Sequence, residues 1–272
     1  MFVFKSIFTS RQIHTRTETF TVARAASLHI RIPNGDVDVH THTDQEIRAV
    51  IKAHGRNAEA DLAQVQVTFD EATATLHVTQ PSRPVIAFSS IDIEIHAPSY
   101  EHISIHTAHG DSHIDAACST LEVRSTAGDI KCTAACHTRM QLESTAGDID
   151  VKHAAAHTDI RSTAGDVDVQ VTQPAQVHVR TTAGDIDVEV ARGFETQIDA
   201  QTLAGDIDND IEITNTADGA GTASDQINEH WKIVATFFHS TIRSSDASLH
   251  RTAHSGRSTA QAGVVDGPAS GW

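Results

Sequence analysis

The chain has 272 residues, of which 39% are hydrophobic but only 4% aromatic, and its formal net charge at pH 7 is −16. The negative charge argues against duplex DNA or RNA as a partner, because phosphate binding needs a basic surface. The shortage of aromatic side chains argues against a carbohydrate-active enzyme, since such enzymes stack sugar rings on aromatic platforms. The 19 histidines make the surface charge depend steeply on pH.

No signal peptide or membrane anchor is evident in the sequence. The first eight residues are apolar but too few for a signal peptide with its cleavage site, and the apolar run at 233–238 is far below the ~20 residues of a membrane span. Three cysteines cannot all pair with one another and suit a reducing compartment. We therefore expect a cytoplasmic protein that reaches a membrane only through a partner.

The N-terminal third is expected to hold strands in an irregular arrangement. Residues 1–23 form a lead-in strand, and residues 24–100 form an irregular β part with one early repeat at 27–40, separated from the main stack. Alternating apolar residues between turn signals predict four further strands. These lie at 47–51, 65–69, 75–78 and 91–95.

A repeat of 18 to 21 residues occupies the segment 101–214. Its mark is Gly-Asp, which in four copies extends to Thr-Ala-Gly-Asp followed by Ile or Val. A fifth copy, at 202–207, is interpreted as carrying one inserted residue. The repeat glycines, including that of the early repeat, are Gly35, Gly110, Gly128, Gly147, Gly165, Gly184 and Gly205.

Apolar residues alternate within each copy, which is the pattern of strands. The inward residues lie at odd distances before the glycine and at even distances after it, as Leu121, Val123 and Ile130 do around Gly128. This change of parity indicates a corner at Ala-Gly, where glycine permits a positive φ or a close backbone approach. The sequence thus predicts an all-β fold, a parallel β-solenoid with coils of 18–19 residues that stack to bury their apolar faces.

The repeat decays after residue 213. Residues 215–262 are predicted to form a degenerate C-terminal cap. Residues 263–272 are predicted to form a flexible tail. The regular coils are accordingly expected to end near residue 214.

The Thr-Ala-Gly-Asp units, preceded by the related string at 28–39, resemble the bacterial putative-adhesin family of β-strand-repeat proteins. This family has a toastrack-type domain and includes LiaG-like envelope-stress proteins, and the resemblance covers residues 19–213. It implies a right-handed β-solenoid, a bacterial source and a link to cell-envelope sensing. The motif of the family is structural, so the resemblance transfers no catalytic residue.

Outward aspartates form two rows that we call the acidic ladder. One row lies at the corners and comprises Asp129, Asp148, Asp166, Asp185 and Asp206. The other lies two residues later and comprises Asp150, Asp168, Asp187 and Asp208. Stacked carboxylates repel one another unless something compensates. Either they accept backbone N–H bonds at the corner, which is the expectation, or they form a string of calcium sites.

Three arginines occupy the outward position four residues before the glycine and form a basic stripe on the other strand of each coil: Arg124, Arg161 and Arg180. Ion pairs with Glu143 are one role for this stripe, and assembly with other molecules is another.

Histidines and cysteines are the remaining metal-ligating residues. His40 and His42 share one strand face, and four histidines crowd the first coil, but no carboxylate or cysteine completes a zinc site, so we expect exposed histidines and no metal or cofactor. Cys118 and Cys136 should stack within disulfide range, while Cys132 should point into the core.

No nucleophile constellation is visible. The hydroxyls three residues before each glycine are expected to form an inward ladder: Thr107, Ser125, Ser144, Ser162, Thr181 and Thr202. We therefore predict a non-enzymatic binding, scaffold or envelope-stress sensing module that docks to a protein partner or to copies of itself. The alternatives are a calcium-dependent cell-surface adhesin and a polysaccharide-active β-helix enzyme.

Overall fold

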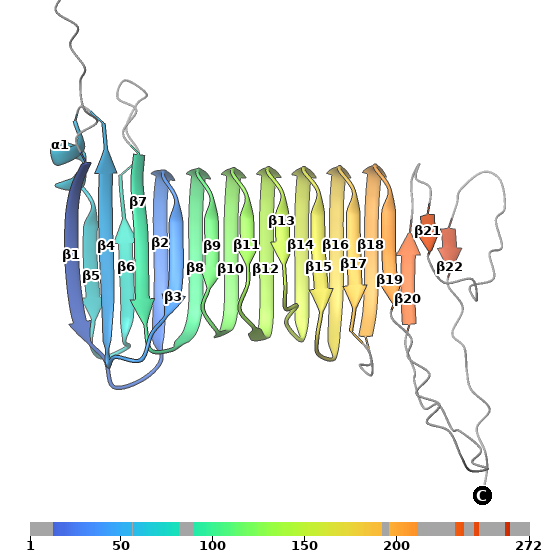
Figure 1. The fold of residues 1–272 in the computed structure, drawn as a ribbon, viewed down its shortest axis with the longest axis horizontal. Helices are drawn as coiled ribbons and strands as arrows, with labels where there is room; N and C mark the ends of the chain where they lie inside the picture. The colour runs from blue at the N-terminus through green and yellow to red at the C-terminus, as the bar shows by residue number, and fades with distance from the viewer. Residues whose placement is uncertain are drawn as a thin grey trace, which may run out of the picture.

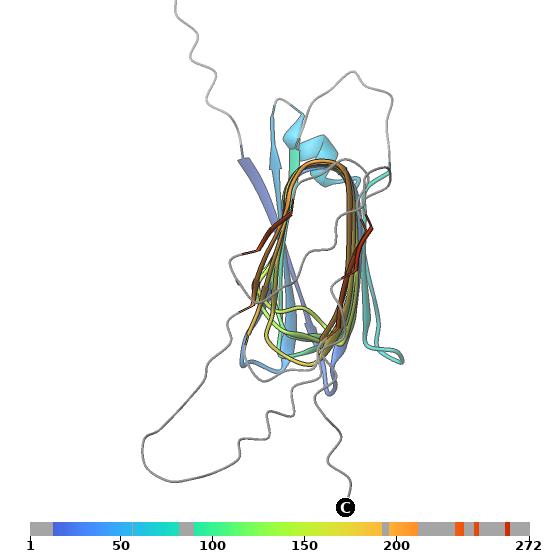
Figure 2. The same ribbon diagram turned by 90° about the vertical axis from the view of Figure 1, so that its right-hand side faces the viewer.

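The computed structural model describes residues 13–55, 57–81, 90–191, 196–211, 232–236, 242–244 and 259–261, with side chains described as far as residue 208. Apart from one short helix, these residues form two 11-stranded sheets that face each other (Figures 1 and 2). Among them there is no helix with the length and apolar character to span a lipid bilayer.

Sheet A contains, in spatial order, β1 (Ile13–Thr21), β4 (Glu46–His54), β7 (Ser90–Ala97), β3 (Val37–Thr41), β9 (Ser112–Asp115), β11 (Ile130–Cys132), β13 (Ile149–Val151), β15 (Val167–Val171), β17 (Ile186–Val190), β19 (Ile207–Ile211) and β21 (Ile242–Ser244). Sheet B contains β5 (Gln66–Asp70), β6 (Thr75–Thr79), β2 (Ala26–Asn34), β8 (Tyr100–His109), β10 (Cys118–Ala127), β12 (Cys136–Ala146), β14 (His157–Ala164), β16 (Ala175–Ala183), β18 (Thr196–Ala204), β20 (Lys232–Thr236) and β22 (Thr259–Gln261). The helix α1 spans Ala58–Leu62.

Each regular coil contributes one strand to each sheet, and the two strands meet at the Gly-Asp corner (Figure 1). Successive strands pair in parallel, as β10 does with both β8 and β12. The result is a β-solenoid of about six turns with a spacing of about 19 residues, as the sequence predicted. Viewed along its axis, the solenoid has a flattened cross-section (Figure 2).

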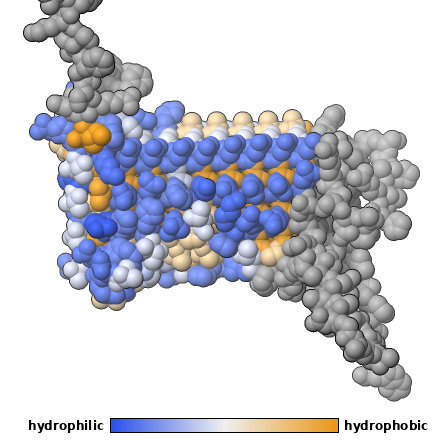
Figure 3. Space-filling view, viewed as in Figure 1, coloured by the Kyte–Doolittle hydropathy of each residue, from blue (hydrophilic) through white to orange (hydrophobic). Residues whose placement is uncertain are grey.

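The core lies between the two sheets and is built from the alternating apolar residues. Leu121 and Val123 on β10 and Ile130 on β11 are all buried, which confirms the change of parity at Gly128. Fully burying one such side chain contributes about 1.5–3 kcal/mol. The outer face seen in Figure 3 carries side chains of similar hydropathy in rows along the axis, because successive coils repeat the same positions.

The corner glycines have positive φ and nearly touch the coil before them. Gly147 has φ +127°, and a Cβ built on it would lie 2.3 Å from the carbonyl oxygen of Gly128. Gly128 stands in the same relation to Gly110, at 2.1 Å. No side chain fits in this space, so the corners require glycine both for conformation and for contact.

The early repeat belongs to the main stack, so the expectation that it is separate was wrong. Strand β2 pairs with β8, and β3 pairs with β9, both in parallel. The carbonyl oxygen of Gly35 therefore contacts Gly110 in the same way as the carbonyl oxygen of each later corner glycine contacts the next one. The chain leaves the stack after β3 and returns to it at β8.

The segment between β3 and β8 closes the N-terminal end. Strands β4, β5, β6 and β7 confirm the four predicted strands, while the sequence did not predict α1. Strands β4 and β1 extend sheet A with antiparallel pairing, and Phe20 of β1 contacts Phe69 of β5 at 5.0 Å between ring centroids. Arg16 donates to the carbonyl oxygens of Leu62 at 3.2 Å and Val65 at 2.8 Å.

The fifth copy of the repeat has no inserted residue, which corrects the sequence interpretation. Thr202 and Ala204 pair with Thr181 and Ala183 in unbroken register. Leu203 simply replaces the threonine of the other copies, and its side chain is 53% exposed. The longer spacing arises in the connection between β17 and β18, which runs from Val190 to Thr196.

Part of the predicted C-terminal cap continues the solenoid. Strands β20 and β21 pair in parallel with β18 and β19, and β22 pairs antiparallel with β20. The rest of the predicted cap, the predicted tail at 263–272 and residues 1–12 of the lead-in segment lie outside the described residues.

The corner contact predicts that Gly147→Ala will destabilise the protein by about 3 kcal/mol or more, because the new Cβ meets backbone and the φ is strained. Ala146→Ser, one residue away and exposed, should change stability by less than about 0.5 kcal/mol. Urea unfolding of the two variants measures the difference, and equal midpoints would contradict the account of the corner.

Candidate functional site

The corner aspartates bond from coil to coil. In each case Oδ1 of one aspartate accepts the backbone N–H of the corner aspartate in the next coil, as Asp148 does from Asp166 at 2.9 Å. The chain of bonds runs through Asp36, Asp111, Asp129, Asp148, Asp166, Asp185 and Asp206. The sequence predicted that these carboxylates accept backbone N–H groups, but it did not predict that the donor belongs to the neighbouring coil.

The second row of the acidic ladder lies on the outer face of sheet A. Asp150, Asp168, Asp187 and Asp208 are successive partners in the strand register. Lys152 Nζ lies 2.8 Å from Asp150 Oδ1 and 3.6 Å from Asp168 Oδ2. The bond to Asp150 raises the pKa of Lys152. In the described part of the chain, no three His, Cys, Asp or Glu side chains are arranged to hold a metal ion.

The arginines of the basic stripe do not stand alone on sheet B. Glu143 lies between Arg124 and Arg161 in the register, and Arg180 lies next to Arg161. Arg124 contacts Glu122 at 2.9 Å and Glu143 at 3.6 Å.

Carboxylates accompany the arginines across the whole face. Arg161 Nε lies 3.1 Å from Asp159 Oδ1 on its own strand. The outer face from β10 to β18 carries equal numbers of arginines and carboxylates, namely Arg124, Arg139, Arg161 and Arg180 with Glu122, Glu143, Asp159 and Asp199. This face is therefore balanced in charge and not basic.

The cysteines lie where the sequence placed them. Cys118 and Cys136 are register partners on β10 and β12, and both are buried free thiols. The hydrogen bond between them and their burial raise the pKa of Cys118. Cys132 is fully buried in the core, and burial raises its pKa.

The hydroxyls three residues before the corner glycines are all buried, as expected from the sequence. Thr107 and Thr181 each donate to the carbonyl oxygen two residues later, at 3.2 Å. Thr202 donates to the carbonyl oxygen of Gly184 at 3.1 Å. These contacts are structural, because every hydroxyl points between the sheets.

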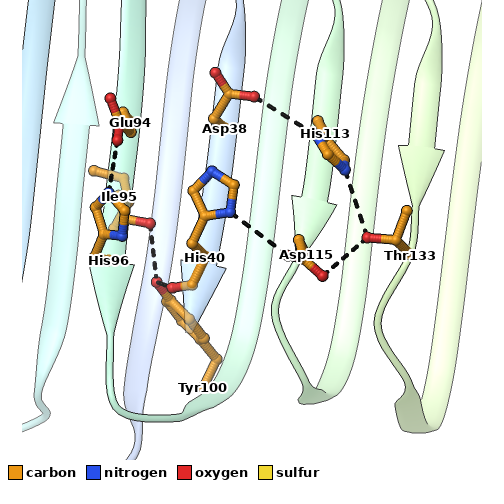
Figure 4. Close-up of polar contacts among 9 residues, drawn as sticks. All are labelled: Asp38, His40, Glu94, Ile95, His96, Tyr100, His113, Asp115 and Thr133. Atoms are coloured by element: carbon orange, nitrogen blue, oxygen red, sulfur yellow. Dashed lines mark hydrogen bonds and ion pairs between the residues drawn. The ribbon is translucent and has the colours of Figure 1, made fainter. Parts of the chain in front are cut away.

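A group of ionisable side chains gathers on the outer face of sheet A, where the irregular N-terminal part meets the first regular coil (Figure 4). We call it the histidine–carboxylate patch. It comprises Glu94 and His96 on β7, Asp38 and His40 on β3, and His113 and Asp115 on β9. The three strands pair in parallel, and in this register His40 lies beside His96 of β7 on one side and beside Asp115 of β9 on the other.

Ion pairs link the members of the patch. Nδ1 of His40 lies 3.8 Å from Asp115 Oδ2, and Nδ1 of His113 lies 3.9 Å from Asp38 Oδ1. The rings of His40 and His96 stack with centroids 5.2 Å apart. These side chains are between 16% and 56% exposed, so a partner can reach them.

Glu94 is the most strongly held carboxylate of the patch. Its two oxygens lie 2.9 Å from Lys52 Nζ and 2.8 Å from His96 Nε2. These bonds lower the pKa of Glu94 to about 2. The carboxylate therefore keeps its charge throughout the range in which histidines titrate.

A buried tyrosine supports the patch from within the fold. The hydroxyl of Tyr100 donates to the carbonyl oxygens of His40 at 3.0 Å and Ile95 at 3.4 Å, so it ties β3 to β7 (Figure 4). Burial raises the pKa of Tyr100, which stays a donor at any ordinary pH.

Sequence reasoning found only part of the patch. It noted His40, and His113 as one of the four histidines of the first coil, but missed Asp38, Glu94, His96 and Asp115. Once the early repeat is aligned with the first coil, Asp38 and His113 occupy the same position of the repeat, and this signal could have found their contact. Glu94 lies in no repeat, so its place required the structure.

A separate row of histidines lies on the outer face of sheet B. His29 stacks on His77 at 4.9 Å and contacts His102 at 5.2 Å between ring centroids. Burial, followed by the neighbouring His102, lowers the pKa of His29. Burial also lowers the pKa of His106. Protonating these rings in the folded state is therefore unfavourable.

The lowered pKa values predict that stability falls as the pH drops from about 7 to 5. Below the ordinary histidine pKa of about 6.5, the unfolded chain binds protons that His29 and His106 resist in the folded state. The contribution of Glu94 is lost only below about pH 4.5, its own unfolded value, and so lies outside this window.

Thermal melts between pH 7.5 and 5 test this expectation. His29→Gln should flatten the dependence on pH, whereas His157→Gln, an exposed residue of the same sheet, should leave it unchanged. If the melting temperature changes with pH equally in the wild type and in His29→Gln, this histidine does not contribute to the pH dependence of stability.

The bonded corner aspartates predict that calcium stabilises the protein little. With Oδ1 of each carboxylate bonded to the next coil, we expect millimolar Ca²⁺ to raise the melting temperature by less than about 2 °C. An increase of many degrees that Asp148→Asn and Asp166→Asn abolish would instead favour the calcium-dependent adhesin.

Comparison with known proteins places this fold in a family. The model of the Toastrack DUF4097 family matches residues 21–233. Among solved structures, the chain is similar to a protein described as a putative adhesin from Bacteroides fragilis, with 17% identity, a TM-score of 0.50 and coverage of 85% of this chain and 97% of that one.

Two further solved structures are similar over 85% of this chain, each with 10% identity. One is described as a putative adhesin from Parabacteroides merdae, with a TM-score of 0.45 and 96% of that chain covered. The other is described as a putative lipid binding protein from Parabacteroides distasonis, with a TM-score of 0.41 and 97% of that chain covered. No curated protein matches the chain. Because the family model spans most of its length, this chain belongs to the Toastrack DUF4097 family, which confirms the resemblance seen in the sequence.

Proposed function

We propose that the chain is a non-enzymatic binding module that recognises a protein partner on the outer face of sheet A. The observation that carries the proposal is the histidine–carboxylate patch. Its six side chains come from three adjacent strands, reach solvent, and are held by ion pairs and by the register. One structural neighbour is described as a putative adhesin, which is the name of a class of binding proteins and supports the same class of function.

The charges of the patch define the kind of partner. The carboxylates Asp38, Glu94 and Asp115 offer negative charge to lysines or arginines of a partner. Histidine is the side chain that ordinarily gains positive charge between pH 8 and 5, and the chain has 19 of them, so acidification makes its surface less attractive to a basic partner. Binding should therefore weaken as the pH falls from 7 toward 5.

Affinity capture from the cells that make the protein tests the proposal. The immobilised wild-type chain should retain a partner at pH 7.5 and release it at pH 5.5. The double variant Asp38→Asn, Asp115→Asn should fail to retain it, while Glu189→Gln, on the same face of sheet A but outside the patch, should behave as wild type.

Other outcomes would replace this account. Loss of the partner only in Arg161→Glu, Arg180→Glu would move the binding surface to sheet B, where the sequence first suggested it. Retention that requires Ca²⁺ would favour the calcium-dependent adhesin, and cleavage of a polysaccharide by the pure chain would favour the enzyme. Envelope-stress sensing requires a membrane-associated partner, which separate capture from soluble and membrane fractions would identify.

A further inference from the structure

Strand β1 forms one edge of sheet A. It pairs with β4 on one side through nine consecutive residues without a break in register, and no described strand pairs with its other side. The unpaired backbone of such an edge is a template for another strand. Among the features that protect natural edge strands, β1 lacks shortness, proline, lysine and a bulge, and its charged residues on the half-buried side are Arg16 and Glu18.

The pairing with β4 fixes which backbone groups of β1 point outward. The N–H of Val22 donates to the carbonyl oxygen of Gln45 at 3.1 Å. In an antiparallel pair the bonded positions alternate, so the even-numbered residues of β1 bond to β4. The N–H and C=O groups of Thr15, Thr17 and Thr19 therefore point toward the open edge.

The sequence of β1 is complementary to itself. If a second β1 pairs antiparallel about Thr17, then Arg16 lies opposite Glu18 of the second copy, and the reverse pair forms on the other side of the axis. Within one chain, Arg16 Nε and Glu18 Oε1 are already 3.0 Å apart. The two copies would thus bring together four groups of alternating charge, and opposite charges across neighbouring strands stabilise a sheet.

Only this register matches the charges. Moving the axis to Arg16 or to Glu18 would place like charges directly opposite each other, which is destabilising. The axis at Thr17 also pairs Thr15 with Thr19 at hydrogen-bonded positions, which agrees with the outward direction of their backbone groups.

We propose that two copies of this chain associate through β1, antiparallel about a two-fold axis at Thr17, to make sheet A continuous across the pair. The two solenoids would then extend in opposite directions from the shared edge. The axis is perpendicular to the sheet, so both histidine–carboxylate patches would lie on the same face. This association does not depend on the proposed function of the patch.

Sedimentation of the full chain at increasing concentration tests the association. We expect a reversible dimer for the wild type and for Thr17→Ala, which keeps the backbone N–H. Thr17→Pro removes an N–H that points to the open edge and should shift the chain to monomer. Glu18→Arg, which would place like charges opposite each other while keeping the bonds of Arg16 to Leu62 and Val65, should also give monomer. A wild type that stays monomeric up to about 100 μM would overturn the proposal.

Cross-linking gives an answer that does not depend on destabilising variants. Two Thr17 residues would face each other across the axis with Cα atoms about 5.5 Å apart, within disulfide range. Thr17→Cys should therefore form a covalent dimer when diamide is added, whereas Thr21→Cys, also an exposed position of the same strand, should not. The native cysteines are buried. Equal cross-linking at both positions would reject the register.

Discussion

The close approach of consecutive corners is the constraint on which the rest of the structure depends. From Gly110 onward a corner glycine leaves no room for a Cβ, since the carbonyl oxygen of the previous corner would lie 2.1–2.3 Å from it. The aspartate that follows each glycine then binds the backbone of the next coil. Together the two residues fix the position of each coil on its neighbour, and the apolar residues on both sides of the corner meet their counterparts in the core. A repeated Gly-Asp is therefore a rule for stacking and not a site for chemistry.

Stacking in register also decides what the surface can do. Equivalent residues of successive coils lie side by side. A charge that recurs at one position of the repeat therefore forms a row of like charges, and a position at which the sign of the charge changes brings opposite charges next to each other. On sheet B the result is alternation, as in Arg124, Glu143 and Arg161, and the face is balanced. On sheet A the aspartates of β13, β15 and β17 stay adjacent. The histidine–carboxylate patch lies where β7, which belongs to no repeat, adds Glu94 and His96 beside the column of Asp38 and His113.

The sequence alone predicted whatever the repeat dictates: the two strands per coil, the corner at each glycine, the inward hydroxyls and the stacking of Cys118 on Cys136. It failed where the arrangement depends on segments far apart in the chain. The early repeat was placed outside the stack, because nothing local shows that the chain leaves after β3 and returns at β8. The patch was missed for the same reason, since Glu94 comes from this excursion. The equal balance of charge on sheet B was missed because arginines were counted without their strand neighbours Glu122 and Asp159.

The claim that aspartate carboxylates connect successive coils has a direct test in amide hydrogen exchange. In the wild type, the amides of Asp148 and Asp166 should both be protected, because each donates to the carboxylate of the coil before it. In Asp148→Ala the amide of Asp166 loses its acceptor, while the amide of residue 148 still donates to Asp129. The account predicts faster exchange at Asp166 alone. Faster exchange at both amides, or at neither, would contradict it.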